Sequence, residues 1–118
     1  MSAAQYDFTI EQGTTHRMSF MWEDSEGVAI NLTDYTARMQ ARKAFSAKEV
    51  LINATTENGM ITLIPATGEV QIELPEAITA MFTWSQALYD LELVSADGTV
   101  TRLVQGSINI SREVTRNG

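Results

Sequence analysis

The 118-residue sequence contains no cysteine and a single histidine, His16. Without cysteine, the chain cannot form a disulfide bond and offers no thiolate for catalysis. A zinc ion needs four ligands, and a lone histidine with no cysteine beside it does not provide them. We therefore interpret His16 as a surface residue, and we predict that the protein carries no metal or other cofactor.

Basic residues are scarce too, with eight Lys and Arg against fifteen Asp and Glu and a formal net charge of −7. A nucleic-acid-binding protein needs a basic face that releases counterions from phosphates. Arg38, Arg42, Lys43 and Lys48 do lie near one another in the sequence. Such charges are better explained as a solvated sheet edge that discourages strand pairing. The composition therefore predicts no binding to DNA or RNA, while the acidity suits a basic protein surface.

The sequence has no apolar run that approaches the length of a membrane span. Residues 1–7 lack the basic start and the apolar stretch of a secretion signal. We therefore expect a product of the cytoplasm with no membrane partner.

Catalytic motifs are missing as well: there is no phosphate loop, no nucleophile elbow and no dinucleotide-binding glycine motif. Asp90 and Glu92 share one face of a predicted strand, and paired carboxylates can perform acid–base chemistry. The same spacing keeps the outer face of a sheet hydrated, and no cleft-forming insertion flanks the pair. Residues 24–26 have too few ligands for a calcium loop. We therefore predict that the protein is not an enzyme.

Alternation of apolar and polar residues is the dominant pattern that the chain does contain. It is clearest over residues 87–111, where Tyr89, Leu91 and Leu93 alternate with Asp90 and Glu92 before a turn at 95–98. Period-two alternation around a glycine-containing turn predicts a β-hairpin. Shorter strands are predicted at residues 6–10, 17–22, 28–32, 36–42, 50–52, 60–64 and 70–74.

One short helical crossover is expected near residues 75–81, because proline suits a first helical position and glutamate a first turn. Its Ile78 and Met81 are expected to fill the core. Eight or nine short strands with one crossover predict an all-β fold, an immunoglobulin-like antiparallel β-sandwich with Greek-key connections. A small barrel is the alternative. We expect a single domain over residues 1–118, with short flexible ends at 1–4 and 112–118.

Three aromatic residues lie near predicted turns: Tyr35, Phe45 and Phe82. They are candidates for a binding surface, because exposed aromatic side chains are enriched among the residues that dominate protein interfaces. Burial of all of them within the domain would contradict this interpretation. The other predicted contact regions are the N-terminal arm, the polar loop at 43–49 and the tail after residue 111. The candidate interface residues are Tyr6, Tyr35, Phe45, Lys48, Phe82 and Arg112.

Four groups of turn and strand motifs extend over nearly the whole chain. They are FTIEQG at residues 8–13, NLTDYTARMQ at 31–40, TENGMITL at 56–63, and LYDLEL at 88–93 with DGTVTRLVQG at 97–106. Together, these segments resemble small immunoglobulin-like virion proteins of tailed bacteriophages. They are similar to the N-terminal domain of siphophage upper baseplate proteins.

The resemblance implies a non-enzymatic virion structural protein, an adaptor or decoration that docks on tail, baseplate, collar or capsid proteins. Its partners would be other phage virion proteins, in multiple symmetric copies. The protein would be made in the cytoplasm of the host bacterium and reside in the virion. The alternative function is a carbohydrate- or host-receptor-binding module on a tail fibre, which requires an exposed aromatic platform.

Overall fold

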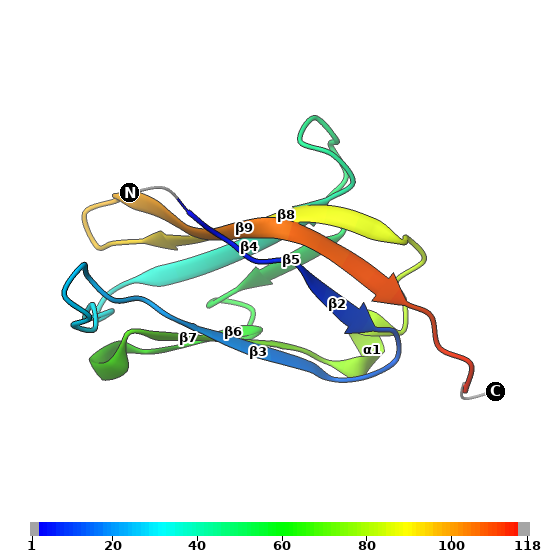
Figure 1. Ribbon diagram of the computed structural model, residues 1–118, viewed down its shortest axis with the longest axis horizontal. Coiled ribbons are helices and arrows are strands. Elements are labelled where there is room, and N and C mark those ends of the chain that lie inside the picture. The colour runs from blue at the N-terminus through cyan, green and yellow to red at the C-terminus, as the bar shows by residue number, and fades with distance from the viewer. Residues whose placement is uncertain (1–2, 116–118) are drawn as a thin grey trace.

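The computed structural model describes residues 3–115, which form two facing β-sheets (Figure 1). About half of the described residues are in strands, and the helical segments are short. The strands are β1 (Ala4–Gln5), β2 (Phe8–Glu11), β3 (His16–Met21), β4 (Thr36–Arg42), β5 (Ile52–Thr55), β6 (Ile61–Ile64), β7 (Glu69–Leu74), β8 (Gln86–Val94) and β9 (Val100–Ser111). A 3₁₀ turn, η1 (Pro65–Thr67), precedes β7, and one helical turn, α1 (Glu76–Thr79), follows it.

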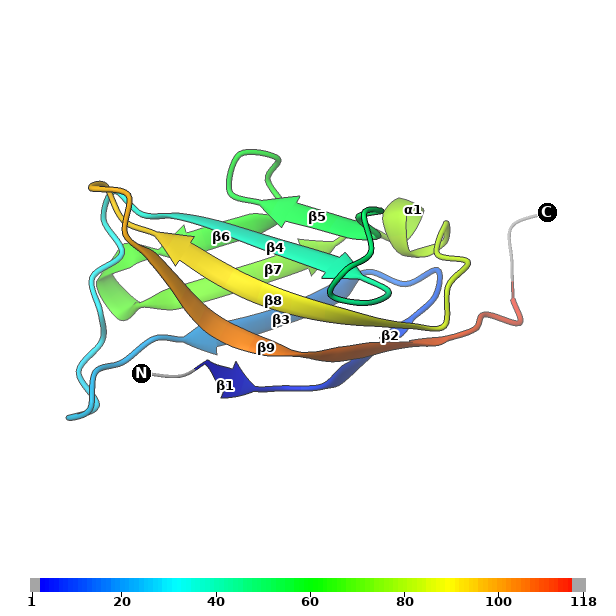
Figure 2. The same cartoon turned by 90° about the horizontal axis from the view of Figure 1, so that it is seen from above.

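The large sheet has the strand order β1-β9-β8-β4-β5, and β2 also pairs with β9. The small sheet has the order β3-β7-β6. Figure 2 looks onto the large sheet, with the small sheet behind it. The predicted all-β, two-sheet architecture is therefore confirmed, and the hairpin predicted at 87–111 is present as β8 and β9.

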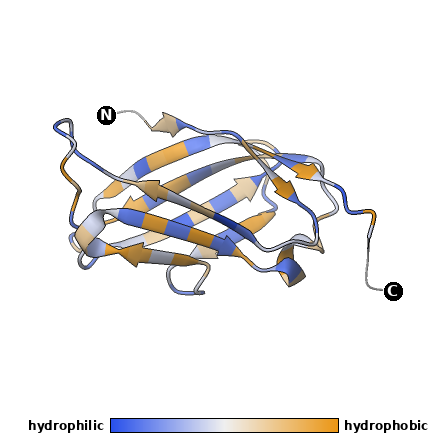
Figure 3. Cartoon of the chain, turned by 60° about the horizontal axis from the view of Figure 1, so that its bottom comes forward, coloured by the Kyte–Doolittle hydropathy of each residue, from blue (hydrophilic) through white to orange (hydrophobic). Residues whose placement is uncertain are grey.

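The core lies between the two sheets and is built from alternate residues of their strands. Figure 3 shows this alternation as bands of opposite hydropathy along the strands. Leu91 of β8, Met39 of β4 and Ile72 of β7 are fully or almost fully buried. Each such side chain contributes about 1.5–3 kcal/mol when it leaves water. Tyr89, Leu91 and Leu93 form the predicted buried stripe.

The N-terminal edge corrects the prediction of a purely antiparallel fold, because β1 and β2 run parallel to β9. Ala4 faces Val104 and Phe8 faces Ile108, so one register continues through both short strands. A parallel neighbour is accessible here because strands β3 to β8 of both sheets lie between β2 and β9 in the sequence, so no tight turn has to join the pair. The strand predicted at 6–10 corresponds to β2, which begins only at Phe8, and the prediction did not include β1 at Ala4–Gln5.

Gly106 allows the N-terminal segment to approach β9 closely between β1 and β2. A Cβ atom at this position would collide with the carbonyl oxygen of Tyr6. The Tyr89 hydroxyl donates to that same oxygen at 2.5 Å, and the Ser107 amide donates to the Asp7 carboxylate at 2.9 Å. Burial of Tyr89 raises the pKa of its hydroxyl, so it remains a donor at neutral pH. These contacts fix the N-terminal arm against the sheet.

The prediction of a strand at residues 28–32 is wrong. This segment carries the chain from β3 in the small sheet to β4 in the large sheet, and its ladder is limited to one bridge between Glu23 and Ala29. Two of the three apolar residues that suggested a strand still pack inward. Leu32 is almost fully buried and Ile30 packs against the core, whereas Val28 is 58% exposed. The strand predicted at 50–52 begins only at Ile52.

The helical turn lies within the predicted range but packs differently from the prediction. Ile78 packs against the core, as expected. Met81 does not, since it is 75% exposed. The helix ends after a single turn, and its fully buried residue is Thr79.

The flexibility expected at residues 1–4 and 112–118 stays a prediction, and the described residues of these ends contact the domain as follows. Ala4 belongs to β1. Arg112 donates from Nη2 to the carbonyl oxygen of Thr83 at 2.9 Å, and the Glu113 amide donates to the Gln12 side chain at 3.0 Å. Residues 1–2 and 116–118 lie outside the described part of the chain. Between residues 3 and 115, none of the helices has the length and apolar character of a membrane span.

Candidate functional site on the outer face of the large sheet

The outer face of the large sheet is polar because each of its strands points alternate side chains away from the core. In the ladder, Arg38 of β4 lies opposite Glu92 of β8, and Gln40 lies opposite Asp90. β9 adds Arg102 on the other side of β8. Charged side chains of both signs are therefore interleaved across three neighbouring strands.

Two ion pairs use the carboxylates that the sequence analysis singled out. Arg38 Nε lies 2.9 Å from Glu92 Oε1, and Arg102 Nε lies 3.5 Å from Asp90 Oδ2. Partial burial raises the pKa of Asp90, the nearby Glu92 carboxylate adds to the rise, and the arginines oppose it. Each carboxylate has its own arginine across the sheet, as expected for a hydrated outer face. Exposed pairs of this kind contribute about 0.2–1 kcal/mol each.

The connection between β4 and β5, residues 43–51, is here called the Phe45 loop. It is the teal segment that rises above the large sheet in Figure 1. The Arg42 guanidinium organises it by donating from Nη1 to the carbonyl oxygens of Ala47 at 2.9 Å and Lys48 at 3.0 Å. Its Nη2 donates to the Gln40 side chain at 2.9 Å. This loop leaves the Phe45 side chain 92% exposed.

A hollow of about 510 Å³ lies between the Phe45 loop and the outer face of the large sheet. It combines one apolar ring with charged and amide side chains, a chemistry suited to binding a polar protein surface or another polar ligand. Its lining includes Phe45, Gln40, Arg42, Asp90, Arg102 and Gln105.

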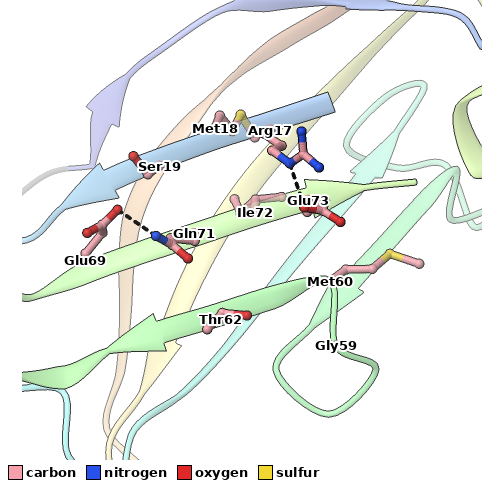
Figure 4. Close-up of a pocket in the computed structure, with 10 residues that line it drawn as sticks. All are labelled: Arg17, Met18, Ser19, Gly59, Met60, Thr62, Glu69, Gln71, Ile72 and Glu73. Atoms are coloured by element: carbon pink, nitrogen blue, oxygen red, sulfur yellow. Dashed lines mark hydrogen bonds and ion pairs between the residues drawn. The ribbon is translucent and has the colours of Figure 1, made fainter. Parts of the chain in front are cut away.

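A second hollow, of about 500 Å³, lies over the outer face of the small sheet (Figure 4). Arg17 pairs there with Glu73 at 2.8 Å, and Gln71 donates to Glu69 at 3.1 Å. These polar side chains satisfy one another, and no aromatic side chain lines the hollow. The hollow beside Phe45 is therefore the stronger candidate.

The candidate interface residues divide into exposed residues and residues that pack into the domain. Phe45, Lys48, Tyr6 and Arg112 are exposed. Phe45 and Lys48 share the Phe45 loop, whereas Tyr6 and Arg112 lie on other elements. The Tyr6 ring packs edge-on against Phe20, with centroids 5.5 Å apart, and is thus held against the domain.

Tyr35 and Phe82 do not meet the expectation of exposure. Tyr35 is half-buried and packs edge-on against Trp22, with ring centroids 5.9 Å apart. Phe82 is only 5% exposed and contacts Trp84, with ring centroids 4.9 Å apart. Both residues follow turns, but their turns lie over the open ends of the sandwich, where an aromatic side chain can enter the core.

His16 is a further correction, because it is half-buried rather than a surface residue. Its ring stacks on Phe8 with centroids 5.2 Å apart. Its Nε2 atom is buried and has no hydrogen-bond partner among residues 3–115. Burial lowers the pKa of His16, which favours the neutral ring.

Sequence reasoning missed the part played by Arg42, which it treated as one charge on a sheet edge. Its partners on the loop are main-chain carbonyl oxygens, and these leave no signature in the side chains of residues 47 and 48. Between residues 3 and 115, no group of three His, Asp or Glu side chains is arranged to hold a metal ion. The chain matches no protein-family model, and no curated protein matches its sequence.

Proposed function

We propose that the chain is an immunoglobulin-like protein-binding module without enzymatic activity. The strand order supports this fold. When β3 to β9 are lettered B, C, C′, D, E, F and G, the small sheet reads B-E-D and the large sheet reads G-F-C-C′. Immunoglobulin sandwiches divide their strands between two sheets in the same way, with Greek-key connections.

We further infer that the module is a structural protein of a bacteriophage virion, an adaptor or decoration that docks on tail, baseplate, collar or capsid proteins. The sequence resemblance to small phage proteins supports this role. Its motifs fall on the parts that define the fold: the entry to β4, the turn before β6, and the β8–β9 hairpin. Other virion proteins are the proposed partners, in multiple symmetric copies.

The exposed Phe45 side chain on an organised loop is the observation that carries the binding role. An aromatic ring in water gains free energy when a partner covers it, and such rings often dominate interfaces. Arg42 reduces the cost of binding, because its hydrogen bonds order the loop before a partner arrives. The hollow beside the ring gives a partner both apolar and polar contacts.

Mass spectrometry of purified phage particles tests the virion assignment. We expect the chain at a fixed ratio to the major tail or capsid protein after density-gradient purification and a high-salt wash. Its absence from washed particles would contradict the assignment.

A carbohydrate- or receptor-binding module is the second candidate, and the hollow favours it because Phe45 lies there with amide and carboxylate side chains. A glycan array followed by a titration of the amide NMR signals of residues 40–48 tests this function. Binding that shifts these signals and is lost in Phe45→Ser supports it. An array without signal contradicts it.

A further inference from the structure

The charges of this chain are separated in space. Three connections lie together at one end of the long axis in both Figure 1 and Figure 2: residues 22–35, 65–69 and 95–99. They contain no Lys or Arg, and we call them the acidic end. Their acidic residues are Glu23, Asp24, Glu26, Asp34, Glu69 and Asp97.

The positive charge gathers elsewhere, on the Phe45 loop and the residue that precedes it. Residues 42–51 contain Arg42, Lys43 and Lys48 against the single acid Glu49. The arginines on the neighbouring sheet face are neutralised by their ion pairs with Glu92 and Asp90. Excess positive charge on this side of the protein therefore belongs to the loop.

Neither charged region is neutralised within the domain. The ion pairs among residues 3–115 join Arg17, Arg38 and Arg102 to their partners, and none involves the acidic end or the lysines of the Phe45 loop. At the acidic end, hydrogen bonds from Ser95 and then Thr99 lower the pKa of Asp97 to about 2. Asp97 consequently stays ionised over the whole physiological pH range.

Each region also presents exposed apolar side chains. Phe45 and Val50 protrude from the loop at 92% and 37% exposure. Val28 lies at the acidic end at 58% exposure, and Val100, the residue of β9 that directly follows this end, is 48% exposed. The two regions are thus opposite in charge and alike in offering apolar contacts.

The acidic end is organised before binding in the same manner as the loop. The Asp24 carboxylate accepts hydrogen bonds from the amides of Glu26 at 2.8 Å and Val28 at 3.0 Å. Gly27 takes the positive φ of 80° that closes this turn. Two ordered surfaces lose little conformational entropy when they meet.

We propose that the Phe45 loop docks on the acidic end of a second copy of this chain, with Phe45 against Val28 and the loop lysines against Glu23 and Glu26. The two contact surfaces differ, so the interface is head-to-tail, and successive copies close into a ring or extend as a filament. The inference goes beyond the proposed function and does not depend on residence in a virion.

Sedimentation velocity over a range of protein concentrations tests this self-association. We expect species heavier than the monomer in low salt and their dissociation in high salt, because salt screens exposed charges. Phe45→Ser, and separately Lys43→Glu with Lys48→Glu, are expected to weaken association by at least about tenfold. The matched control is Met81→Ser, which removes another exposed apolar side chain just after α1 and is expected to leave association unchanged.

Site-specific cross-linking locates the contact. Because the chain has no native cysteine, only the introduced cysteines can form disulfides. A mixture of Ser46→Cys (Phe45 loop) and Ser25→Cys (Asp24 turn) is expected to form mixed disulfide dimers several-fold faster than either variant alone. The control mixture of Ser46→Cys with Ser19→Cys, on the outer face of β3, is expected to form mixed dimers no faster than either variant alone.

A wild-type protein that is monomeric at every concentration would overturn the proposal. So would association that survives Phe45→Ser and high salt, or cross-linking without preference. Detection of the chain in particles decides the virion assignment separately, whichever way these experiments turn out.

Discussion

Two connections each carry a phenylalanine beside a turn: the one from β4 to β5 and the one from β7 to β8. The two side chains differ in their exposure to solvent. Phe45 in the first is 92% exposed, and Phe82 in the second is 5% exposed. The first connection joins neighbours within the large sheet, whereas the second passes from the small sheet to the large one. A connection between sheets passes over the open end of a sandwich, so an apolar side chain such as Phe82 can reach the core, whereas Met81 in the same connection points to solvent. A connection within one sheet projects beyond the core.

The two connections are also held by different contacts. The buried Thr79 hydroxyl ties the β7–β8 connection to the loop before β3, donating to the Thr14 carbonyl oxygen at 2.7 Å and accepting from the Gly13 amide at 3.1 Å. The Phe45 loop depends on Arg42, which is half-buried. Buried hydrogen bonds cost more to lose than exposed ones. We therefore expect substitutions in the β7–β8 connection to lower the free energy of unfolding more than substitutions in the Phe45 loop.

The largest expected effect comes from Phe82→Ala. Removing the buried ring should lower the free energy of unfolding by about 3–5 kcal/mol, because apolar contacts are lost and a cavity remains. Urea denaturation followed by tryptophan fluorescence measures this loss. A loss below about 1 kcal/mol would mean that the β7–β8 connection is not part of the core, and the comparison would fail.

Thr79→Val should have the next largest effect, because valine keeps the shape of the side chain and removes its hydroxyl. The Gly13 amide and the Thr14 carbonyl oxygen then lose their partner, at a cost of about 1–3 kcal/mol. Denaturation measures the cost, and faster hydrogen exchange at the Gly13 amide locates it. Thr79→Ser retains the hydroxyl and serves as the control, with that amide still protected.

Arg42→Lys tests the other connection. Lysine keeps the charge but lacks the planar fork that reaches two carbonyl oxygens and an amide side chain together. We expect a loss of about 1 kcal/mol in stability and lower NMR order parameters for residues 44–48. Arg38→Lys, four residues earlier on the same strand face, is the control and should leave the loop ordered. An unchanged loop in Arg42→Lys would show that other contacts hold it.

The smallest effect on stability is expected for Phe45→Ser. The ring is already in water, so the free energy of unfolding should change by no more than about 0.5 kcal/mol. The same substitution should weaken association with partners. A destabilisation comparable to that of Phe82→Ala would show that Phe45 packs against the domain in solution.

The period-two pattern was sufficient to predict the sheets, because burial of one face leaves a direct trace in the sequence. Tyr89, Leu91 and Leu93 are buried and Asp90 and Glu92 lie on the outer face, as predicted. The parallel pairing of β2 with β9 could not be predicted in this way, because alternation is the same for a parallel and an antiparallel neighbour. The strand prediction at 28–32 failed because Ile30 and Leu32 pack against the core where the chain crosses between the sheets, without belonging to a strand.

The candidate site was only partly predictable for a related reason. Phe45 and Phe82 both lie beside turns, and their difference in exposure depends on which strands their connections join. Arg42 acts on main-chain carbonyl oxygens, which every residue possesses. Such contacts follow from the path of the backbone, and the spacing of side chains in the sequence does not predict them.

The parallel pairing of the N-terminal arm with β9 has a mechanical consequence. In Figures 1 and 2, β1 begins near one end of the long axis and β9 finishes near the other. Tension applied between the two ends of the chain would therefore slide β1 and β2 along β9, loading their hydrogen bonds together instead of peeling them apart one at a time. We expect the domain to withstand pulling along this axis better than its free energy of unfolding alone would suggest, and single-molecule stretching through the two ends measures that resistance.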